Sequence, residues 1–146
     1  MLPRQKQREI IFQILYSMDF TGDFDEGLLD LIAIKLKVAK SHVRAAYAKV
    51  QGIQKHLPDI DAKIQRCALS YAFERILSVE KNILRLGFYE ICYEKVPGKV
   101  AIAEAIRLCK KFATPESTKF INAILDAEYK LLPHPEKQEA LGALNV

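Results

Sequence analysis

Residues 78–92 have the sequence SVEKNILRLGFYEIC, and this stretch decides the fold class. Ser78 is a suitable N-cap residue, and Glu80 places a carboxylate near the positive end of a helix. The apolar residues that follow cover much of a helical circumference; they are Ile83, Leu84, Leu86, Tyr89, Ile91 and Cys92. The sequence therefore predicts a central, mostly buried helix. Gly87 in its middle costs about 1 kcal/mol relative to Ala, which a close approach of another helix would explain.

Helical periodicity continues on both sides of this stretch and breaks at Gly and Pro. Toward the C-terminus, the sequence VPG at 96–98 is expected to end the central helix, and a further helix is expected from Val100 to Phe112. The sequence TPE at 114–116 combines a cap, a proline and a carboxylate, and predicts the start of a last helix.

Four further helices are expected before the central one. Two cover about residues 3–19 and 25–36, and Ser41 is expected to cap a third. The fourth follows a break at Pro58, with Asp59 or Asp61 as its cap, and carries Ile64, Ala68 and Tyr71. Because no sustained period-two alternation occurs, the sequence predicts an all-α fold of about seven helices.

Length and composition favour one globular domain. The chain has 146 residues, and half of them are hydrophobic, so a core can be buried. No apolar run approaches the roughly 20 residues that cross a bilayer. The N-terminus also lacks the apolar core and small-residue cleavage site of a signal peptide. We therefore expect a cytoplasmic protein without membrane contacts.

The charge distribution points to a short basic arm. The net charge is +4, and Arg4, Lys6 and Arg8 crowd the N-terminus before an acidic stretch. Such an arm on a nearly balanced body can attract polyanions. A solvated charged surface explains the charge equally simply.

Neither metal nor catalytic motifs stand out. Cys67, Cys92 and Cys109 are widely spaced, form no Cys-x-x-Cys pair and lie outside metal-ligand spacing of any histidine. They are expected to be reduced, mostly buried thiols. The sequence contains no Gly-rich phosphate loop, no Gly-x-Ser-x-Gly and no His-Glu-x-x-His. We therefore expect a protein that is not an enzyme and needs no metal or cofactor.

A set of short motifs occurs in the order and at the spacing typical of one family. In the second half these are ILRLGFYE at 83–90, VP at 96–97, VAIAEA at 100–105, KF at 111–112, Ser117, KFIN at 119–122 and ILD at 124–126. In the first half, Arg8 is followed by QILYS at 13–17. By these motifs the chain resembles the NusB family over about residues 4–130, with 21–75 only loosely constrained.

The resemblance implies two packed helical subdomains and a role in transcription antitermination. NusB-like proteins bind a single-stranded boxA element in nascent RNA together with the ribosomal protein NusE. The pair helps RNA polymerase in the antitermination complex to read through terminators, notably in rRNA operons. We accordingly expect one domain over 1–132, with an N-terminal half at about 1–57 and a C-terminal half at about 58–132. Residues 133–146 are then a tail.

The resemblance also implies roles for cationic residues of the first helix and for surface residues of the first and central helices. Arg4, Lys6 and Arg8 match the family's arginine-rich start, where cationic side chains meet RNA phosphates. Tyr16 and Glu90 match positions on the surface that supports NusE and RNA. The alternatives are a solvated helix end for the cations, a core-edge aromatic for Tyr16, and a helix-face ion pair for Glu90.

The junction before the last helix faces RNA in the family. Phe112, Glu116 and Ser117 lie there, and Lys111 and Lys119 could add contacts with the RNA backbone. Exposed N–H groups near Glu116 and Ser117 could bind a phosphate or a base edge. A Phe at helical spacing such as Phe112 is alternatively a core residue.

A second function remains open at this point. The basic arm is thinner than is usual in the family, and glutamines interrupt it. The alternative is a NusB fold used for protein interaction or homodimerisation without specific RNA binding.

Overall fold

The computed structural model describes residues 2–69 and 72–133, and all its regular elements in these ranges are helical. The elements are α1 (Arg4–Thr21), α2 (Glu26–Leu36), α3 (Lys40–Lys55), α4 (Leu57–Cys67), the 3-10 helix η1 (Phe73–Arg75), α5 (Ser78–Cys92), α6 (Gly98–Phe112) and α7 (Pro115–Leu131). The expected all-α fold of about seven helices is confirmed.

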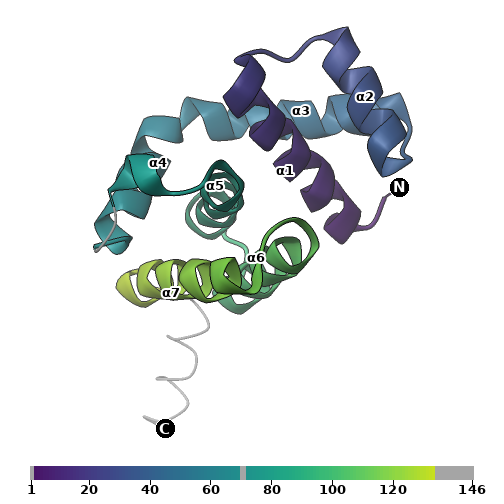
Figure 1. The fold of residues 1–146 in the computed structure, drawn as a ribbon. Coiled ribbons are helices and arrows are strands. Elements are labelled where there is room, and N and C mark those ends of the chain that lie inside the picture. The colour runs from purple at the N-terminus through teal and green to yellow at the C-terminus, as the bar shows by residue number, and fades with distance from the viewer. Residues whose placement is uncertain (1, 70–71, 134–146) are drawn as a thin grey trace, which may run out of the picture.

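Helix α5 occupies the centre of the molecule. Figure 1 shows it almost end-on, with α1, α3, α4, α6 and α7 around it, and it contacts each of these helices. Most of its residues from Asn82 to Ile91 are buried. The central buried helix predicted from residues 78–92 is therefore confirmed.

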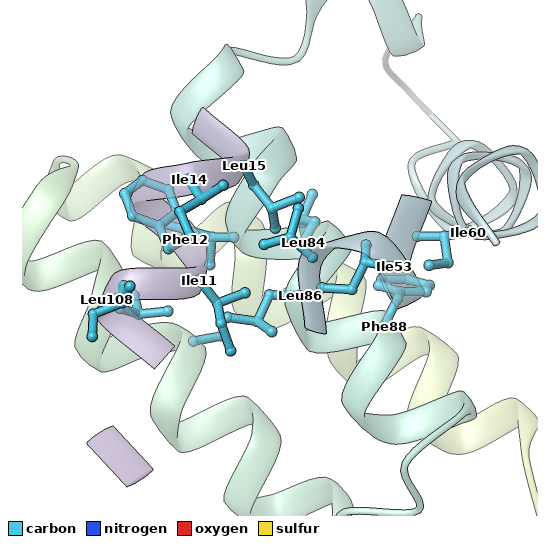
Figure 2. Close-up of a cluster of buried hydrophobic side chains, with 14 of the residues drawn as sticks. Ile11, Phe12, Ile14, Leu15, Ile53, Ile60, Leu84, Leu86, Phe88 and Leu108 are labelled. Carbon is cyan, nitrogen blue, oxygen red and sulfur yellow. The ribbon is translucent and has the colours of Figure 1, made fainter. Parts of the chain in front are cut away.

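One hydrophobic core joins the helices around α5. Figure 2 shows Ile11 and Leu15 of α1 in a cluster with Leu84 and Leu86 of α5. Burial of each such side chain stabilises the fold by about 1.5–3 kcal/mol. Helix α2 packs outside this ring, against α1 and α3.

The close approach expected at Gly87 occurs between α5 and α7. A Cβ atom at Gly87 would lie 2.9 Å from Cδ2 of Leu125, which is closer than ordinary van der Waals contact. Because Leu125 is fully buried, its side chain has little room to move aside. This contact explains why a glycine is found in the middle of a central helix.

The predicted start of the last helix is also confirmed. Thr114 is the N-cap of α7, and its hydroxyl oxygen accepts a hydrogen bond from the backbone N–H of Ser117. Pro115 occupies the first turn, where the missing N–H has no cost.

Three other expected caps were wrong. Ser78 is the first residue of α5, with Leu77 at the N-cap, and its hydroxyl donates to Asp19 at 2.8 Å. Ser41 lies inside α3, which begins at Lys40 without a side-chain cap. Asp59 and Asp61 lie inside α4, because this helix begins at Leu57 and accommodates the proline in its first turn.

Some expectations fall outside what the structure describes. Tyr71 and residues 134–146 lie outside the described ranges. The division into halves at about residue 57 stays a prediction. None of the helices in the described ranges has the length and apolar character required to cross a membrane.

Candidate nucleic-acid interface

Buried ion pairs hold α1 against α5 and α6. The Arg8 side chain is 9% exposed, and its Nη2 lies 2.9 Å from Oε2 of Glu90 while its Nε donates to Oε1 at 3.1 Å. Its Nη1 also donates to Oε1 of Glu104, on α6, at 3.2 Å. One guanidinium thus connects three helices.

The exposure expected for Arg8 and Glu90 differs from what the structure shows. Arg8 was expected in the exposed basic arm and Glu90 on a partner-binding surface, but both are buried against each other. Both residues nevertheless line the hollow that Arg4 and Lys49 also border, so their expected roles in binding stay predictions. The alternative of an ion pair holds for Glu90, with Arg8 of a different helix as its partner.

The remaining cations of the arm point to different sides of α1. Arg4 is exposed and lines a hollow between α1, α3 and α5, together with Lys49 and Glu94. Lys6 lies toward α6, where its Nζ is 3.6 Å from Oε1 of Glu9. The structure therefore does not bring Arg4, Lys6 and Arg8 together into one patch.

A second buried carboxylate, Glu9, gathers cations from α1 and α6. Glu9 is 5% exposed, and it accepts hydrogen bonds from Nζ of Lys111 at 2.7 Å and from Nη1 of Arg107 at 2.8 Å. Burial acts to raise the pKa of Glu9, but these hydrogen bonds outweigh it and hold the pKa below its usual value. The group Glu9, Lys6, Arg107 and Lys111 is called the Glu9 cluster below.

Four aromatic rings form a row next to this cluster. Phe112 packs against Phe12 with ring centroids 4.9 Å apart, Phe12 stacks on Tyr16 at 5.7 Å, and Tyr16 meets the edge of Phe20 at 5.1 Å. Phe12 is buried, Tyr16 and Phe112 are half-buried, and Phe20 is 67% exposed. The structure thus joins Tyr16 and Phe112, two residues singled out separately in the sequence, into one aromatic row.

The start of α7 differs from the expectation in one respect. Ser117 is 2% exposed, its N–H is used by the Thr114 cap, and its hydroxyl donates to Oε2 of Glu80 at 2.6 Å. Ser117 is therefore not free to offer its N–H to a phosphate. Glu116 and Lys119, on the same helix turn and the next, are exposed as a surface contact requires.

The sequence indicated neither Glu9 nor Arg107 as a site residue, gave Lys111 only as a contact with the RNA backbone, and gave Glu80 only as a helix-start residue. The contacts of Glu9 with α6 span 98 and 102 positions, and that of Ser117 with Glu80 spans 37. No periodic pattern within one helix can indicate contacts over such distances.

The described residues contain no group of three or more His, Cys, Asp or Glu side chains that could hold a metal ion. The three cysteines are free, and Cys109 is buried. Burial raises the pKa of the Cys92 thiol to about 11 and that of Cys109 to about 12. Both thiols therefore stay protonated and weakly nucleophilic at neutral pH.

Known proteins are similar to this chain in sequence and in the arrangement of their helices. The model of the NusB family matches residues 5–130. The transcription antitermination protein NusB of Pseudothermotoga lettingae is 36% identical over 141 residues, which cover 94% of this chain and 99% of that protein. The NusB of Chlamydia pneumoniae is 38% identical over 125 residues, covering 85% of this chain and 78% of that protein.

Solved structures agree with these relatives. The NusB of T. maritima has a TM-score of 0.76 at 34% identity and covers 94% of this chain and 98% of its own. A structure of the antitermination factors NusB and NusE in complex with dsRNA has a TM-score of 0.74 at 29% identity. That match covers 88% of this chain and 97% of the other.

Proposed function

The chain belongs to the NusB family, and from this premise we propose that it is a transcription antitermination adaptor. It binds boxA-type single-stranded RNA together with the ribosomal protein NusE, and it joins the RNA polymerase antitermination complex that transcribes rRNA operons. It acts in the cytoplasm by binding its partners rather than by catalysis. Its relatives carry the name of antitermination proteins, and a similar fold has been solved with NusE and RNA.

The observation that carries the proposal is the aromatic row Phe112, Phe12, Tyr16 and Phe20. Proteins that bind single strands stack bases on aromatic side chains, at about 1–3 kcal/mol per base. Phe20 has an exposed ring, and Tyr16 adds a partly exposed ring beside it. Buried Phe12 stacks on Tyr16, and Tyr16 contacts Phe20, so the rings of Tyr16 and Phe20 are positioned before RNA binds.

Lys111 lies beside the row, and it supplies phosphate contacts together with exposed cations of α1 and α7. Lys111 precedes Phe112 on α6, with its Nζ 5.9 Å from the centroid of the Phe112 ring. Lys119 is exposed on α7, and Lys6 and Arg4 belong to the first turn of α1. Glu116 repels phosphate, so it fits a contact with a base edge better.

Tyr16 is the residue proposed for the shared surface with NusE, because it is accessible and lies between the core and the exposed end of the row. Glu90 contributes indirectly. Its buried ion pair with Arg8 holds α1, and therefore Tyr16, in position against α5.

The test measures the fluorescence anisotropy of a labelled boxA-type RNA and of a scrambled RNA, each with and without NusE. We expect tighter binding to the boxA-type RNA and a further gain with NusE. Equal, weak binding to both RNAs without help from NusE would contradict the proposal and favour a protein-interaction role.

A pair of variants connects this test to the aromatic row. Phe20→Ala removes an exposed ring, so it should weaken RNA binding about tenfold, which corresponds to about 1.4 kcal/mol of stacking. Ile34→Ala removes a side chain on α2 that is 74% exposed, and it should leave binding unchanged. Equal affinities for the two variants would exclude Phe20 from the RNA site.

A further inference from the structure

We propose that Lys6, Arg107 and Lys111 form a binding site for phosphates of the RNA backbone, and that the buried carboxylate of Glu9 is the positioning residue that assembles this site. The inference rests on the proposed function, since the ligand is the same RNA. It extends the interface from the aromatic row along α1 and α6 and assigns a role in RNA binding to a negatively charged residue.

The geometry shows why Glu9 organises the site. Lys111 and Arg107 come from α6 and Lys6 from α1, and the carboxylate of Glu9 lies within 2.7, 2.8 and 3.6 Å of their nitrogen atoms. Three long, flexible cationic side chains are thereby gathered at one place. Without the carboxylate, mutual repulsion and side-chain entropy would spread them apart.

Each cation keeps hydrogen-bond donors for a ligand. The Lys111 ammonium uses one N–H for Glu9, and the 3.6 Å separation at Lys6 is longer than a hydrogen bond. Arg107 donates to Glu104, Glu9 and the carbonyl oxygen of Gln5, which leaves N–H groups of its guanidinium unused. Phosphate oxygens can therefore be bound without breaking the contacts with Glu9.

Exposure makes the outer surface of the cluster positive. The Glu9 side chain is 6% exposed, whereas that of Lys111 is 48% exposed, that of Lys6 31% and that of Arg107 26%. The carboxylate therefore lies beneath the cations as seen from solvent. An RNA phosphate that approaches this face meets positive charge first.

The site adjoins the aromatic row, where Nζ of Lys111 lies 5.9 Å from the centroid of the Phe112 ring. Glu9 and Phe12 are three residues apart on α1 and therefore lie on the same face, while Lys111 and Phe112 are adjacent on α6. A single strand whose bases stack on Tyr16 and Phe20 can thus place its backbone along Lys111, Arg107 and Lys6. The phosphate contacts of the RNA backbone and the stacking of its bases are then made by neighbouring parts of one surface.

The decisive variant is Glu9→Gln, compared with Glu26→Gln. Both substitutions remove one negative charge, but Glu26 is exposed on α2 and, within the described residues, its one ion pair is with Arg44. If charge alone mattered, both variants would bind RNA slightly more tightly than the wild-type protein. If Glu9 positions the cations, Glu9→Gln binds more weakly although its net charge is more positive, and Glu26→Gln does not.

The readout is the dependence of affinity on salt, measured by anisotropy with the labelled boxA-type RNA. Glu9→Gln should lower the steepness of the plot of log binding constant against log salt concentration by about 0.7 for each lost phosphate contact. The loss of one contact corresponds to about fivefold weaker binding at about 0.1 M salt. A Glu9→Gln variant that binds as tightly as Glu26→Gln, with the wild-type slope, would overturn the inference.

A second comparison guards against a folding defect. Lys111→Gln removes one cation of the cluster, and Lys35→Gln, an exposed lysine on α2, is its control. If Glu9 acts through its cations, Lys111→Gln also lowers the slope and Lys35→Gln does not. Glu9→Gln then reduces RNA affinity less in the Lys111→Gln protein than in the wild-type protein. Losses that add fully would overturn the positioning role. If the wild-type protein binds no RNA, the proposed function itself fails, whereas an unaffected Glu9→Gln overturns only this inference.

Discussion

Arg8 and Glu90 form a buried two-point ion pair that joins α1 to α5 across 82 positions of sequence. Their side chains are 9% and 7% exposed, so water screens the pair very little. The pair fixes the helix that carries Tyr16 and Phe20 against the central helix. We therefore expect the main effect of substituting Arg8 or Glu90 to be on the stability of the fold.

Removing one partner of this pair should destabilise the fold strongly. Glu90→Ala leaves the Arg8 guanidinium without its main partner, and we expect the free energy of unfolding to fall by about 3–5 kcal/mol. Urea unfolding followed by circular dichroism measures this loss. Arg44→Ala, which removes a surface partner of Glu26, should cost less than about 1 kcal/mol.

A double variant tests the cause of that loss. Arg8→Met combined with Glu90→Met replaces both charges by apolar groups, and it should be more stable than Glu90→Ala because no buried charge is left unpaired. A double variant at least as unstable as Glu90→Ala would show that the ion pair itself holds the helices. Glu90→Lys would place a second buried cation beside Arg8, so a loss of partner binding in this variant would report on the stability of the fold rather than on a partner surface.

The contact between Gly87 and Leu125 predicts the effect of adding one methyl group. Gly87→Ala gains up to about 1 kcal/mol of helix propensity but places its Cβ against Leu125, so we expect a net loss of about 1 kcal/mol in the free energy of unfolding. Gly27→Ala, where the nearest atom is Oδ1 of Asp25 at an ordinary 3.4 Å, should be neutral or stabilising. Two equally stabilising substitutions would show that α5 and α7 do not meet at Gly87.

Glu9 should make part of the stability depend on pH. Hydrogen bonds from Lys111 and Arg107 hold the pKa of Glu9 below its usual 4.5 in the folded protein. Its stabilising contribution is therefore complete above the unfolded pKa and is lost as the pH falls through the lower, folded pKa. The difference in unfolding free energy between the wild-type protein and Glu9→Gln should be large at about pH 7 and shrink at about pH 3.

Urea titrations at both pH values measure this difference. Glu26→Gln, at an exposed position, is the control and should differ little from the wild-type protein at either pH. A Glu9→Gln difference that stays constant from neutral to acidic pH would mean that the charge of Glu9 adds no stability.

Local sequence was sufficient for the helices and for some of their contacts. Residues 78–92 predicted the central helix, Thr114 and Pro115 predicted the start of α7, and Gly87 predicted a close helix approach, because each signal lies within one or two turns. Caps were less predictable, since the first residue of a helix can shift by one or two positions without changing its apolar face.

The contacts of charged residues could not be predicted from the basic arm. Arg4, Lys6 and Arg8 look alike in sequence, yet Arg8 is buried, Arg4 is exposed beside the same hollow, and Lys6 lies at Glu9 instead. The signal that separates them is the position of Arg8 three and four residues before Ile11 and Phe12, which extends the buried face of α1 back to Arg8. Its partner on α5 is visible only once the helices are packed together.

The most direct test of the account asks where the RNA lies. A boxA-type RNA containing 4-thiouridine is cross-linked to the protein by ultraviolet light, and the attached peptides are identified by mass spectrometry. We expect cross-links in α1 around Tyr16 and Phe20 and at the junction of α6 and α7 around Phe112. The stacked rings of His56 and Tyr93, where α3 ends and α5 meets α4, provide an internal comparison. Cross-links there, with the peptides of α1 unmodified, would contradict the account.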